Sequence, residues 1–321
     1  MMICCSKAPP RSIFSLTNFI KHLPITKPRS SLVSVEFKSY CSTSSFTSAA
    51  NFSYYDSLNA RQKEQISLYV EALLQWNQKM NLTAVREPED VMERHVNDSL
   101  AIIPPIRNSY SSYCKGSNDN LNLVDVGTGA GLPGIVLAIA CPDWNVTLME
   151  SMNKRCIFLE HAVELTGLNN AKVVRGRAES LGQNQEYREV YDVAVARAVA
   201  EMRILAEYCL PLVRLGGLFV AAKGHDPKEE VINAERAVQM MGASVVKLCT
   251  VDSHSPHGQR TAVVCYKGHS TPKKYPRDPV ACGVSLFLRW LLMVQWSAAP
   301  VCLPFSVMSN TTWSKLTGKM L

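Results

Sequence analysis

The hydrophobic pattern between residues 121 and 267 alternates between two periods. Short β-rich runs occur at "LNLVDV", "NVTLME", "AKVVRG", "VYDVAVA" and "GLFVAAK", and a stretch with helical spacing follows each of them. Because strands joined by helical crossovers pair in parallel, these runs predict a parallel sheet covered on both faces. Two further runs, "ASVVKLCTV" and "TAVVCYK", are separated only by the polar segment 252–260. They predict a terminal hairpin that adds one antiparallel edge strand, and the fold class is α/β.

A smaller region ahead of the sheet has the period of amphipathic helices. Segment 57–80 places apolar residues at helical spacing, with Asn59 suited to the N-cap. The segment "EPEDVMERHVNDSL" predicts a second helix, because Pro88 suits a first helical position and its acidic neighbours suit the positive end of the helix dipole. We therefore expect a helical N-terminal part over residues 51–107 and a polar linker over 108–120.

The first 50 residues differ from the rest in composition. They are rich in Ser and Thr and contain six Lys or Arg residues against a single acid, Glu36. This composition is typical of an organelle transit peptide, and the compact apolar run of a secretory signal is missing. We predict a disordered transit peptide over residues 1–50. The chloroplast is favoured over the mitochondrion because hydroxylated residues are many and arginines few; an untargeted disordered tail is the alternative.

The formal net charge of +7 over 321 residues resembles a nucleic-acid signal, but its distribution argues against that interpretation. Residues 51–280 contain 25 basic and 26 acidic residues, so any nucleic-acid surface must be a local patch. The 11 cysteines are scattered without the spacing of a zinc site. We expect reduced thiols and no metal.

The stretch "LVDVGTGAGLPGIVLAIA" has the pattern of a strand, a glycine-rich turn and a helix. In a parallel sheet such a turn lies at the carboxyl ends of the strands, where ligands bind. The spacing from Gly129 to Gly134 fits a P-loop, but Ile135 and Val136 stand where the lysine and the hydroxyl residue belong. Nucleoside triphosphate binding is therefore disfavoured, and a turn without any ligand is the plainest alternative.

Two ligand classes fit the turn. Its glycines match the dinucleotide pattern G-x-G-x-x-G, and Glu150 follows where a ribose-binding acid belongs. A site for S-adenosyl-L-methionine instead carries an acid before G-x-G-x-G, and here these residues are Asp125, Gly127, Gly129 and Gly131. Asp125 repels a diphosphate but suits a ligand that carries an ammonium and a sulfonium group. The sequence thus favours the methyl donor over NAD(P).

Several motifs in order resemble one family. The segments "NLTAVREPEDVMERHVNDSL", "VDVGTGAGLPGIVLAI", "LMESMNKRCIFLE", "VARAVAEM" and "LGGLFVAAKG", followed by "QRTAVVCYK" and "TPKKYPR", resemble the bacterial small-subunit ribosomal RNA guanine-N7 methyltransferases, the glucose-inhibited division protein B family. The resemblance implies a seven-stranded Rossmann-like class I methyltransferase sheet with a small helical N-terminal layer, and a methyltransferase domain over residues 121–279. It also implies methyl transfer from S-adenosyl-L-methionine to N7 of a guanosine in 16S rRNA. With the leader, the chain is similar to an organellar, plant-like version whose partner is the 16S rRNA or small ribosomal subunit of an organelle.

One group of residues is expected to bind the donor. The glycines let the backbone approach its methionine part, Leu132 packs near it, and Glu150 accepts hydrogen bonds from the ribose hydroxyls. The resemblance places Ala178 and Glu179 near the adenine, although a helix-start acid is an alternative reading of Glu179. The full set of cofactor-binding candidates is Asp125, Gly127, Gly129, Gly131, Leu132, Glu150, Ala178, Glu179 and Arg197.

Three residues are candidates for the reaction itself. Arg197 ends the fourth strand, and the resemblance implies contact with the donor or the target base; an ion pair with a nearby acid is the alternative. The resemblance places His95 beside the cleft, whereas a lone helical histidine is more often structural. Lys223 ends the fifth strand and suits an RNA phosphate, or has no role. No general base is expected, because guanine N7 has an exposed lone pair.

Other RNA contacts are weaker predictions. Asn81 follows the first helix, with turn capping as its alternative role. Lys154 and Arg155 open a helix and suit phosphate. The segment "TPKKYPR" groups three cations with Tyr275 as a local nucleic-acid patch, and a solvated charge cluster is the alternative.

The resemblance stops at Pro279. Residues 280–321 then form a divergent hydrophobic tail near membrane-span length, but Arg289, Gln295 and Pro300 interrupt it. We expect no membrane contact, a tail outside the packed core, and a monomer.

The alternative functions are an NAD(P)-dependent oxidoreductase and a non-catalytic RNA-binding ribosome-assembly factor.

Overall fold

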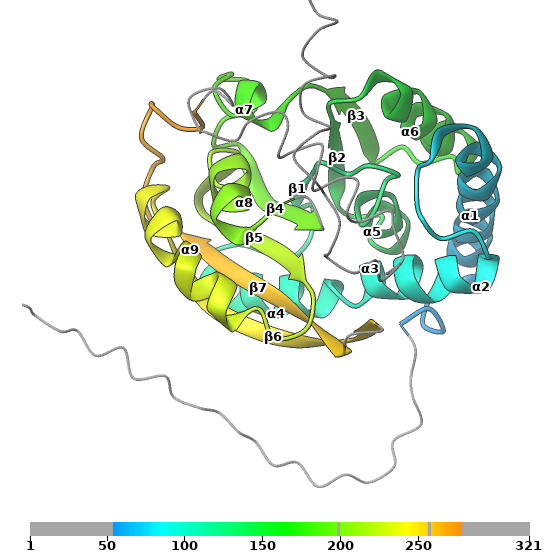
Figure 1. Ribbon diagram of the computed structural model, residues 1–321, viewed down its shortest axis with the longest axis horizontal. Coiled ribbons are helices and arrows are strands. Elements are labelled where there is room, and N and C mark those ends of the chain that lie inside the picture. The colour runs from blue at the N-terminus through cyan, green and yellow to red at the C-terminus, as the bar shows by residue number, and fades with distance from the viewer. Residues whose placement is uncertain (1–53, 198–199, 256–257, 278–321) are drawn as a thin grey trace, which may run out of the picture. The chain divides into compact units, whose positions relative to one another are not determined.

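The computed structural model describes residues 54–197, 200–255 and 258–277 (Figure 1). The predicted leader and the predicted hydrophobic tail lie outside these residues. Within the described ranges, none of the helices is both long enough and apolar enough to cross a membrane.

A seven-stranded sheet forms the centre of the fold, in the order β3-β2-β1-β4-β5-β7-β6. The strands are β1 (Asn122–Val126), β2 (Asn145–Glu150), β3 (Ala171–Arg175), β4 (Tyr191–Arg197), β5 (Val213–Lys223), β6 (Ala243–Ser255) and β7 (Gly258–Lys267). The first five pair in parallel, and β7 is antiparallel to both of its neighbours. This confirms the predicted α/β class and the Rossmann-like methyltransferase sheet. The strand order reverses between β1 and β4, where parallel sheets bind ligands.

The predicted position of the antiparallel strand was wrong. It is β7, which lies between β5 and β6, while β6 is the edge strand. Residues Ala262 to Cys265 of β7 are all buried, so both faces of this strand need cover, whereas Ser244, Lys247 and Thr250 of β6 are exposed. The more apolar of the two strands therefore takes the inner position.

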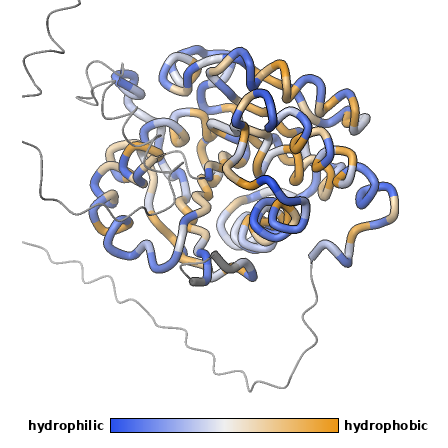
Figure 2. Tube along the Cα trace, turned by 45° about the vertical axis from the view of Figure 1, so that its right-hand side comes forward, coloured by the Kyte–Doolittle hydropathy of each residue, from blue (hydrophilic) through white to orange (hydrophobic). Residues whose placement is uncertain are grey.

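Helices cover both faces of the sheet (Figure 1). They are α1 (Ala60–Met80), α2 (Pro88–Val91), the π-helix η1 (Met92–Asn97), α3 (Asp98–Leu100), α4 (Ile103–Tyr113), α5 (Gly134–Ala140), α6 (Asn153–Leu165), α7 (Ala178–Leu181), α8 (Met202–Cys209) and α9 (Lys228–Met240). In β1, Leu123 belongs to the core shared with α1, α4, α5 and α6, whereas Val124 belongs to the core shared with α8 and α9. Figure 2 shows the corresponding gathering of hydrophobic segments inside the fold.

The N-terminal helices belong to the same core as the strands. Asn59 caps α1 in a capping box with Gln62, and Pro88 is the first residue of α2, as the sequence predicted. The expected linker over 108–120 is partly wrong, because α4 continues to Tyr113. The hydroxyl of Tyr110 donates a hydrogen bond to Asp192 Oδ1 at 2.9 Å, so a long-range contact supports the polar end of this helix.

Candidate active site

The glycine turn between β1 and α5 lies at the carboxyl edge of the sheet. Gly127, Gly129 and Gly131 have positive φ values of 70°, 61° and 93°, which L-amino acids with side chains rarely adopt. A Cβ atom on Gly131 would collide with Ile135, so this glycine is needed for packing. Among the described residues, a Cβ atom on Gly129 would meet only Gly127 O, at 3.9 Å. Gly129 is therefore the position where the turn leaves open space for a ligand.

Asp125 is fully buried at the end of β1 and holds the turn together. Its Oδ2 accepts hydrogen bonds from Thr128 Oγ1 at 2.5 Å and from the Gly134 amide at 2.7 Å. Its Oδ1 is buried and has no hydrogen-bond partner in the part of the chain that the structure describes. Burial raises the pKa of Asp125 to about 6, although both hydrogen bonds act in the opposite direction. One acceptor oxygen therefore remains unused beside the turn.

Glu150, which ends β2, is only 4% exposed and bonds to two backbone segments. Its Oε1 accepts hydrogen bonds from the amides of Ser151 and Met152, both at 2.8 Å. Its Oε2 accepts one from the Gly129 amide at 3.1 Å and lies 3.7 Å from Arg155 Nη1. The predicted ribose-binding acid is thus fixed against the glycine turn. Arg155, expected to contact phosphate, lies beside this carboxylate.

These features fit the expected donor better than a dinucleotide. Two buried carboxylates border the turn, one of them with an unpartnered oxygen, and the space above Gly129 is open. A cationic ligand with hydroxyl groups can use both acids, whereas a diphosphate would be repelled by them. S-adenosylmethionine therefore fits the residues present.

The other donor candidates lie around the same edge. Leu132 is buried in the hydrophobic core. Ala178 and the buried Glu179 begin α7, which follows β3, and the Gly176 amide before them donates to Glu150 O at 2.9 Å.

Tyr69 of α1 is a contact that the sequence analysis missed. It is fully buried, and its hydroxyl donates a hydrogen bond to Ala130 O in the glycine turn at 2.7 Å. Burial raises the pKa of Tyr69 well above its usual range, so the hydroxyl stays protonated as a donor. The only sequence signal for this role was a tyrosine at helical spacing between Ile66 and Leu73. The N-terminal helix α1 thus supports the glycine turn directly.

Arg197 ends β4 and forms the ion pair that the sequence analysis held as its alternative. Its Nη1 donates a hydrogen bond to Asp98 Oδ2 at 2.9 Å and lies 3.4 Å from Ser99 Oγ and His95 O. Val195, two residues earlier, pairs with Asp125 of β1. Arg197 therefore lies beside the start of the glycine turn. Asp98 was not among the predicted residues.

His95 lies in the π-helix and is held by local structure. Its Nε2 is 2.7 Å from Thr83 Oγ1, and its Nδ1 is 3.1 Å from Arg94 O. Burial, assisted by the positive charge of Arg197, lowers the pKa of His95 to about 4, so the ring is neutral at physiological pH. Asn81 takes the left-handed conformation that ends α1, which is its alternative role of turn capping.

Lys223 and Arg277 are engaged in ion pairs within the protein, whereas the other two C-terminal cations are exposed. Lys223 Nζ lies 2.6 Å from Glu230 Oε1 and donates to Ala200 O at 2.8 Å. Tyr275 is buried, and Arg277 binds Glu207 at 2.7 Å. The expected patch is thus built around a core tyrosine, with Lys273 and Lys274 exposed at its surface. Among the described residues, no cluster of His, Cys, Asp or Glu could hold a metal ion.

Comparisons with known proteins identify a family. The family model of rRNA small subunit methyltransferase G (GidB) matches residues 62–263. Ribosomal RNA small subunit methyltransferase G of Alkaliphilus oremlandii is 45% identical over 216 residues, which cover 67% of this chain and 87% of that protein. The protein of the same name from Alkaliphilus metalliredigens is 42% identical over 222 residues, with 69% and 89% covered.

Similarity to solved structures is weaker. The Methanococcus jannaschii fibrillarin pre-rRNA processing protein is 17% identical with a TM-score of 0.38, covering 51% of this chain and 77% of that chain, and no conclusion depends on it. The family model, in contrast, spans the glycine turn, Glu150 and Arg197. Because it matches more than half of the chain and the curated relatives are this similar, the chain belongs to the rRNA small subunit methyltransferase G family.

Proposed function

We propose that this chain transfers a methyl group to N7 of a guanosine in the 16S rRNA of an organelle's small ribosomal subunit. Family membership makes it an rRNA methyltransferase with S-adenosylmethionine as the methyl donor, which decides against the oxidoreductase alternative. The choice of N7 rests on the site. The bound donor supplies an electrophilic methyl group, and an acceptor with an exposed lone pair needs no base.

The observation that supports the proposal is how the two acids and the histidine near the turn are hydrogen-bonded. Asp125 and Glu150 accept hydrogen bonds from the protein's own turn residues, and His95 is neutral and hydrogen-bonded to Thr83. Asp125 Oδ1 has no partner among the described residues but is fully buried, so none of the three groups is exposed as a base to an RNA substrate. Methylation of an amino or hydroxyl group, in contrast, requires proton removal. The described residues instead provide proximity and alignment, which contribute up to ~7–11 kcal/mol in favourable cases.

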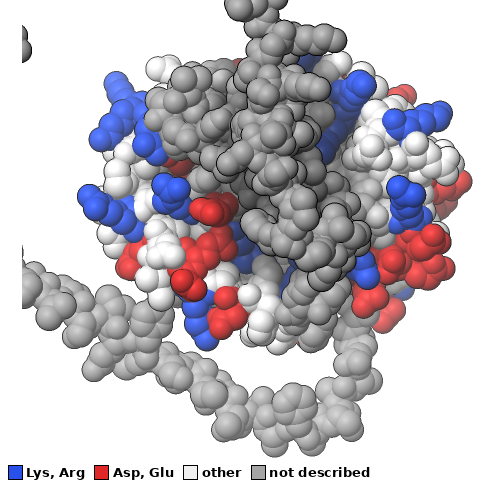
Figure 3. Space-filling view, in the orientation of Figure 1, with Lys and Arg blue, Asp and Glu red and all other residues white. Residues whose placement is uncertain are grey.

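The surface charge favours one approach for the RNA. In Figure 3 acidic side chains gather over α2 and over α9. The first turn of α2 contains Glu89 and Asp90, and that of α9 contains Glu229 and Glu230. RNA phosphates are repelled there and attracted to exposed cations such as Lys154 and Arg177, which follow β2 and β3 at the carboxyl edge.

The test is methyl transfer to small ribosomal subunits that lack the modification. Labelled donor and purified chain should place one methyl group on 16S rRNA, and borohydride reduction followed by aniline cleavage should locate it as N7-methylguanosine. Labelled RNA that resists this cleavage would contradict the N7 assignment. RNA that stays unlabelled, despite donor binding, would contradict the substrate and favour a non-catalytic assembly factor.

The organelle is a separate part of the proposal and depends on the composition of residues 1–50, which are basic, hydroxylated and nearly free of acids. A fluorescent protein fused behind this segment should enter the chloroplast, with the mitochondrion as the alternative. A diffuse cytosolic signal would contradict both destinations.

A further inference from the structure

Asp98 lies where three parts of the fold meet. It is the first residue of α3, directly after the π-helix, and its side chain is only 2% exposed. Arg197 reaches it from the end of β4, Ser253 from β6 and Arg260 from β7. Asp98 thus links the N-terminal helices to β4 and to the β6–β7 hairpin through one side chain.

Both carboxylate oxygens of Asp98 are engaged. Oδ2 accepts the hydrogen bond from Arg197 Nη1 at 2.9 Å. Oδ1 accepts one from Ser253 Oγ at 2.9 Å and lies 3.0 Å from Arg260 Nε, which makes no aligned hydrogen bond. One carboxylate therefore faces two guanidinium groups, and the cluster keeps an excess positive charge.

Stability alone does not explain this cluster. Burying charges costs solvation free energy, and buried ion pairs can often be replaced by apolar residues without loss of stability. What such a pair does provide is one defined geometry for its members. The preceding π-helix, a feature often found at functional sites, brings Asp98 and the His95 carbonyl to the same Arg197 nitrogen.

The position of Arg197 connects the cluster to the donor turn. Val195 pairs with Asp125, and Arg197 lies two residues further along β4, as Gly127 does along β1. Each hydrogen bond between Arg197 and another described residue uses Nη1, which leaves Nε and Nη2 for a bound base or donor.

We propose that Asp98 is a positioning residue for methyl transfer, whose carboxylate fixes the Arg197 guanidinium at the carboxyl edge with its remaining N–H groups directed to the substrate. This inference rests on the proposed function. Asp98 itself touches neither donor nor RNA. It acts through Arg197, and Ser253 and Arg260 hold its carboxylate in place.

The test is a double-mutant cycle with Asp98→Asn and Arg197→Ala, measured as donor affinity by calorimetry and as kcat per donor-binding site. Asp98→Asn keeps the size of the side chain and removes its charge. We expect kcat to fall by about tenfold or more and the donor Kd to change by less than about threefold. The double variant should be no more than about twofold slower than Arg197→Ala alone, because both changes remove the same interaction. Asp98→Glu, which restores the charge, should recover part of kcat.

Asp192→Asn is the matched control. Asp192 lies on β4, at the opposite end of the strand from Arg197. It accepts hydrogen bonds from Arg214 Nε at 2.6 Å, Tyr110 OH at 2.9 Å and the Asn122 amide at 2.8 Å. The Asp192→Asn variant should have a lower melting temperature and an unchanged kcat per donor-binding site. If both variants lose kcat equally, Asp98 is merely structural.

Three outcomes overturn the proposal: a wild-type kcat for Asp98→Asn, additive losses in the cycle, or equal losses in the control. If Asp98→Asn does not fold, Ser253→Ala replaces it, since that variant removes one hydrogen bond and keeps every charge. It should lower kcat by about two- to fivefold without changing the donor Kd, and an unchanged kcat overturns the proposal. A wild-type chain that binds donor but does not methylate rRNA would instead contradict the proposed function.

Discussion

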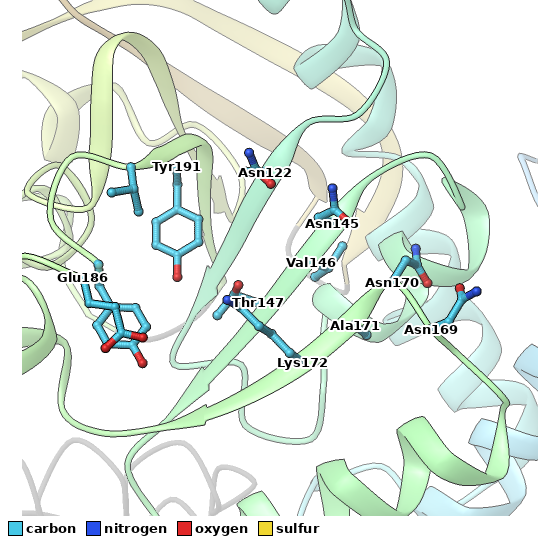
Figure 4. A pocket seen from close by; sticks show the side chains of 12 residues that line it. Asn122, Asn145, Val146, Thr147, Asn169, Asn170, Ala171, Lys172, Glu186 and Tyr191 are labelled. Carbon is cyan, nitrogen blue, oxygen red and sulfur yellow. The ribbon is translucent and has the colours of Figure 1, made fainter.

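The amino and carboxyl edges of the sheet differ, and the size of a hollow does not indicate which edge binds the donor. A hollow of about 440 Å³ opens at the amino edge (Figure 4). It is lined by residues at the start of β1, β2, β3 and β4, among them Asn122, Asn145, Lys172 and Tyr191, and by Glu186 of the segment before β4. The carboxyl edge carries the positive-φ glycines and two buried carboxylates. We therefore expect donor binding at the carboxyl edge, because a buried charge needs a partner, whereas an open polar surface does not.

Each edge also has a carboxylate–arginine cluster that includes one residue of β4, and the two clusters differ in their balance of charge. Asp192 pairs with one arginine, Arg214, whose side chain is 36% exposed. Asp98 faces Arg197 and Arg260, whose side chains are 11% and 23% exposed. An exposed, balanced pair contributes to stability at most modestly, whereas an enclosed cluster with excess charge is suited to an anionic or electron-rich partner.

The largest expected effect is at the glycine turn. Gly129→Asp should abolish donor binding, because a carboxylate there fills the open space, strains a positive φ and adds charge beside Glu150. Gly167→Asp is the control, since Gly167 has a φ of 63°, open surroundings, and a position between α6 and β3 away from the turn. Calorimetry should detect donor binding for the control and none for Gly129→Asp. Equal donor affinities for the two variants would show that the glycine turn at the carboxyl edge does not bind the donor.

Loss of Glu150, the predicted ribose-binding acid, should have the next largest effect. Glu150→Ala removes an acceptor whose charge-assisted hydrogen bonds are typically worth ~1.5–3 kcal/mol each, and donor affinity should fall ~10- to 100-fold. Glu186→Ala, an exposed acid at the amino-edge hollow, is the comparison and should leave the donor Kd unchanged. A wild-type Kd for Glu150→Ala would place the ribose elsewhere.

The pH dependence sharpens the comparison further. The folded-state pKa of Asp125 is about 6, and a cationic donor prefers the ionised carboxylate. Affinity should be complete above about pH 7, fall as the pH drops through 6, and be about tenfold weaker at pH 5. His95, with a pKa of about 4, stays neutral in this range. Calorimetry at several pH values should show this fall, and Asp125→Asn should abolish it.

The titration of Asp125 does not destabilise the folded chain over the pH range in which donor affinity is expected to fall. Since the folded-state pKa of Asp125 lies above its ordinary value of 3.8, the folded chain holds this proton more tightly between pH 3.8 and 6. Asp125 therefore adds stability as the pH falls through that window. A donor affinity that is independent of pH would show that Asp125 does not face the ligand.

The smallest expected effect is at the amino-edge hollow. Lys172→Ala and Asn145→Ala change its lining without touching the turn, so the donor Kd and kcat should stay within about twofold of wild type. The methylation assay and calorimetry check both values together. A loss of more than tenfold in kcat with normal donor binding would make the amino edge part of the RNA contact.

Local patterns were sufficient for most of the fold. The seven strands follow period-2 or continuously apolar runs, and the capping box at Asn59 follows from adjacent residues. The glycine turn was predictable because positive φ is a property of glycine itself. Interactions of this kind depend on residues within a few positions, which a sequence displays directly.

Side-chain partners were less predictable. The sequence placed Arg197 and Lys223 at strand ends, but not beside Asp98 and Glu230. Asp98 is 99 residues from Arg197, and its role depends on how α3 packs against β4. The same applies to Tyr69, which reaches the glycine turn only because α1 lies against α5 in the folded chain.

By itself, the sequence determined the α/β class, the strand segments, the donor turn and the acids that border it, because each depends on local spacing and backbone freedom. Only the tertiary structure decided that β7 lies inside the sheet, that α4 extends to Tyr113, and that Asp98 joins two arginines from different strands. The physical reason is that burial and ion pairing depend on distances in space. Those distances are set by the packing of segments far apart in the chain.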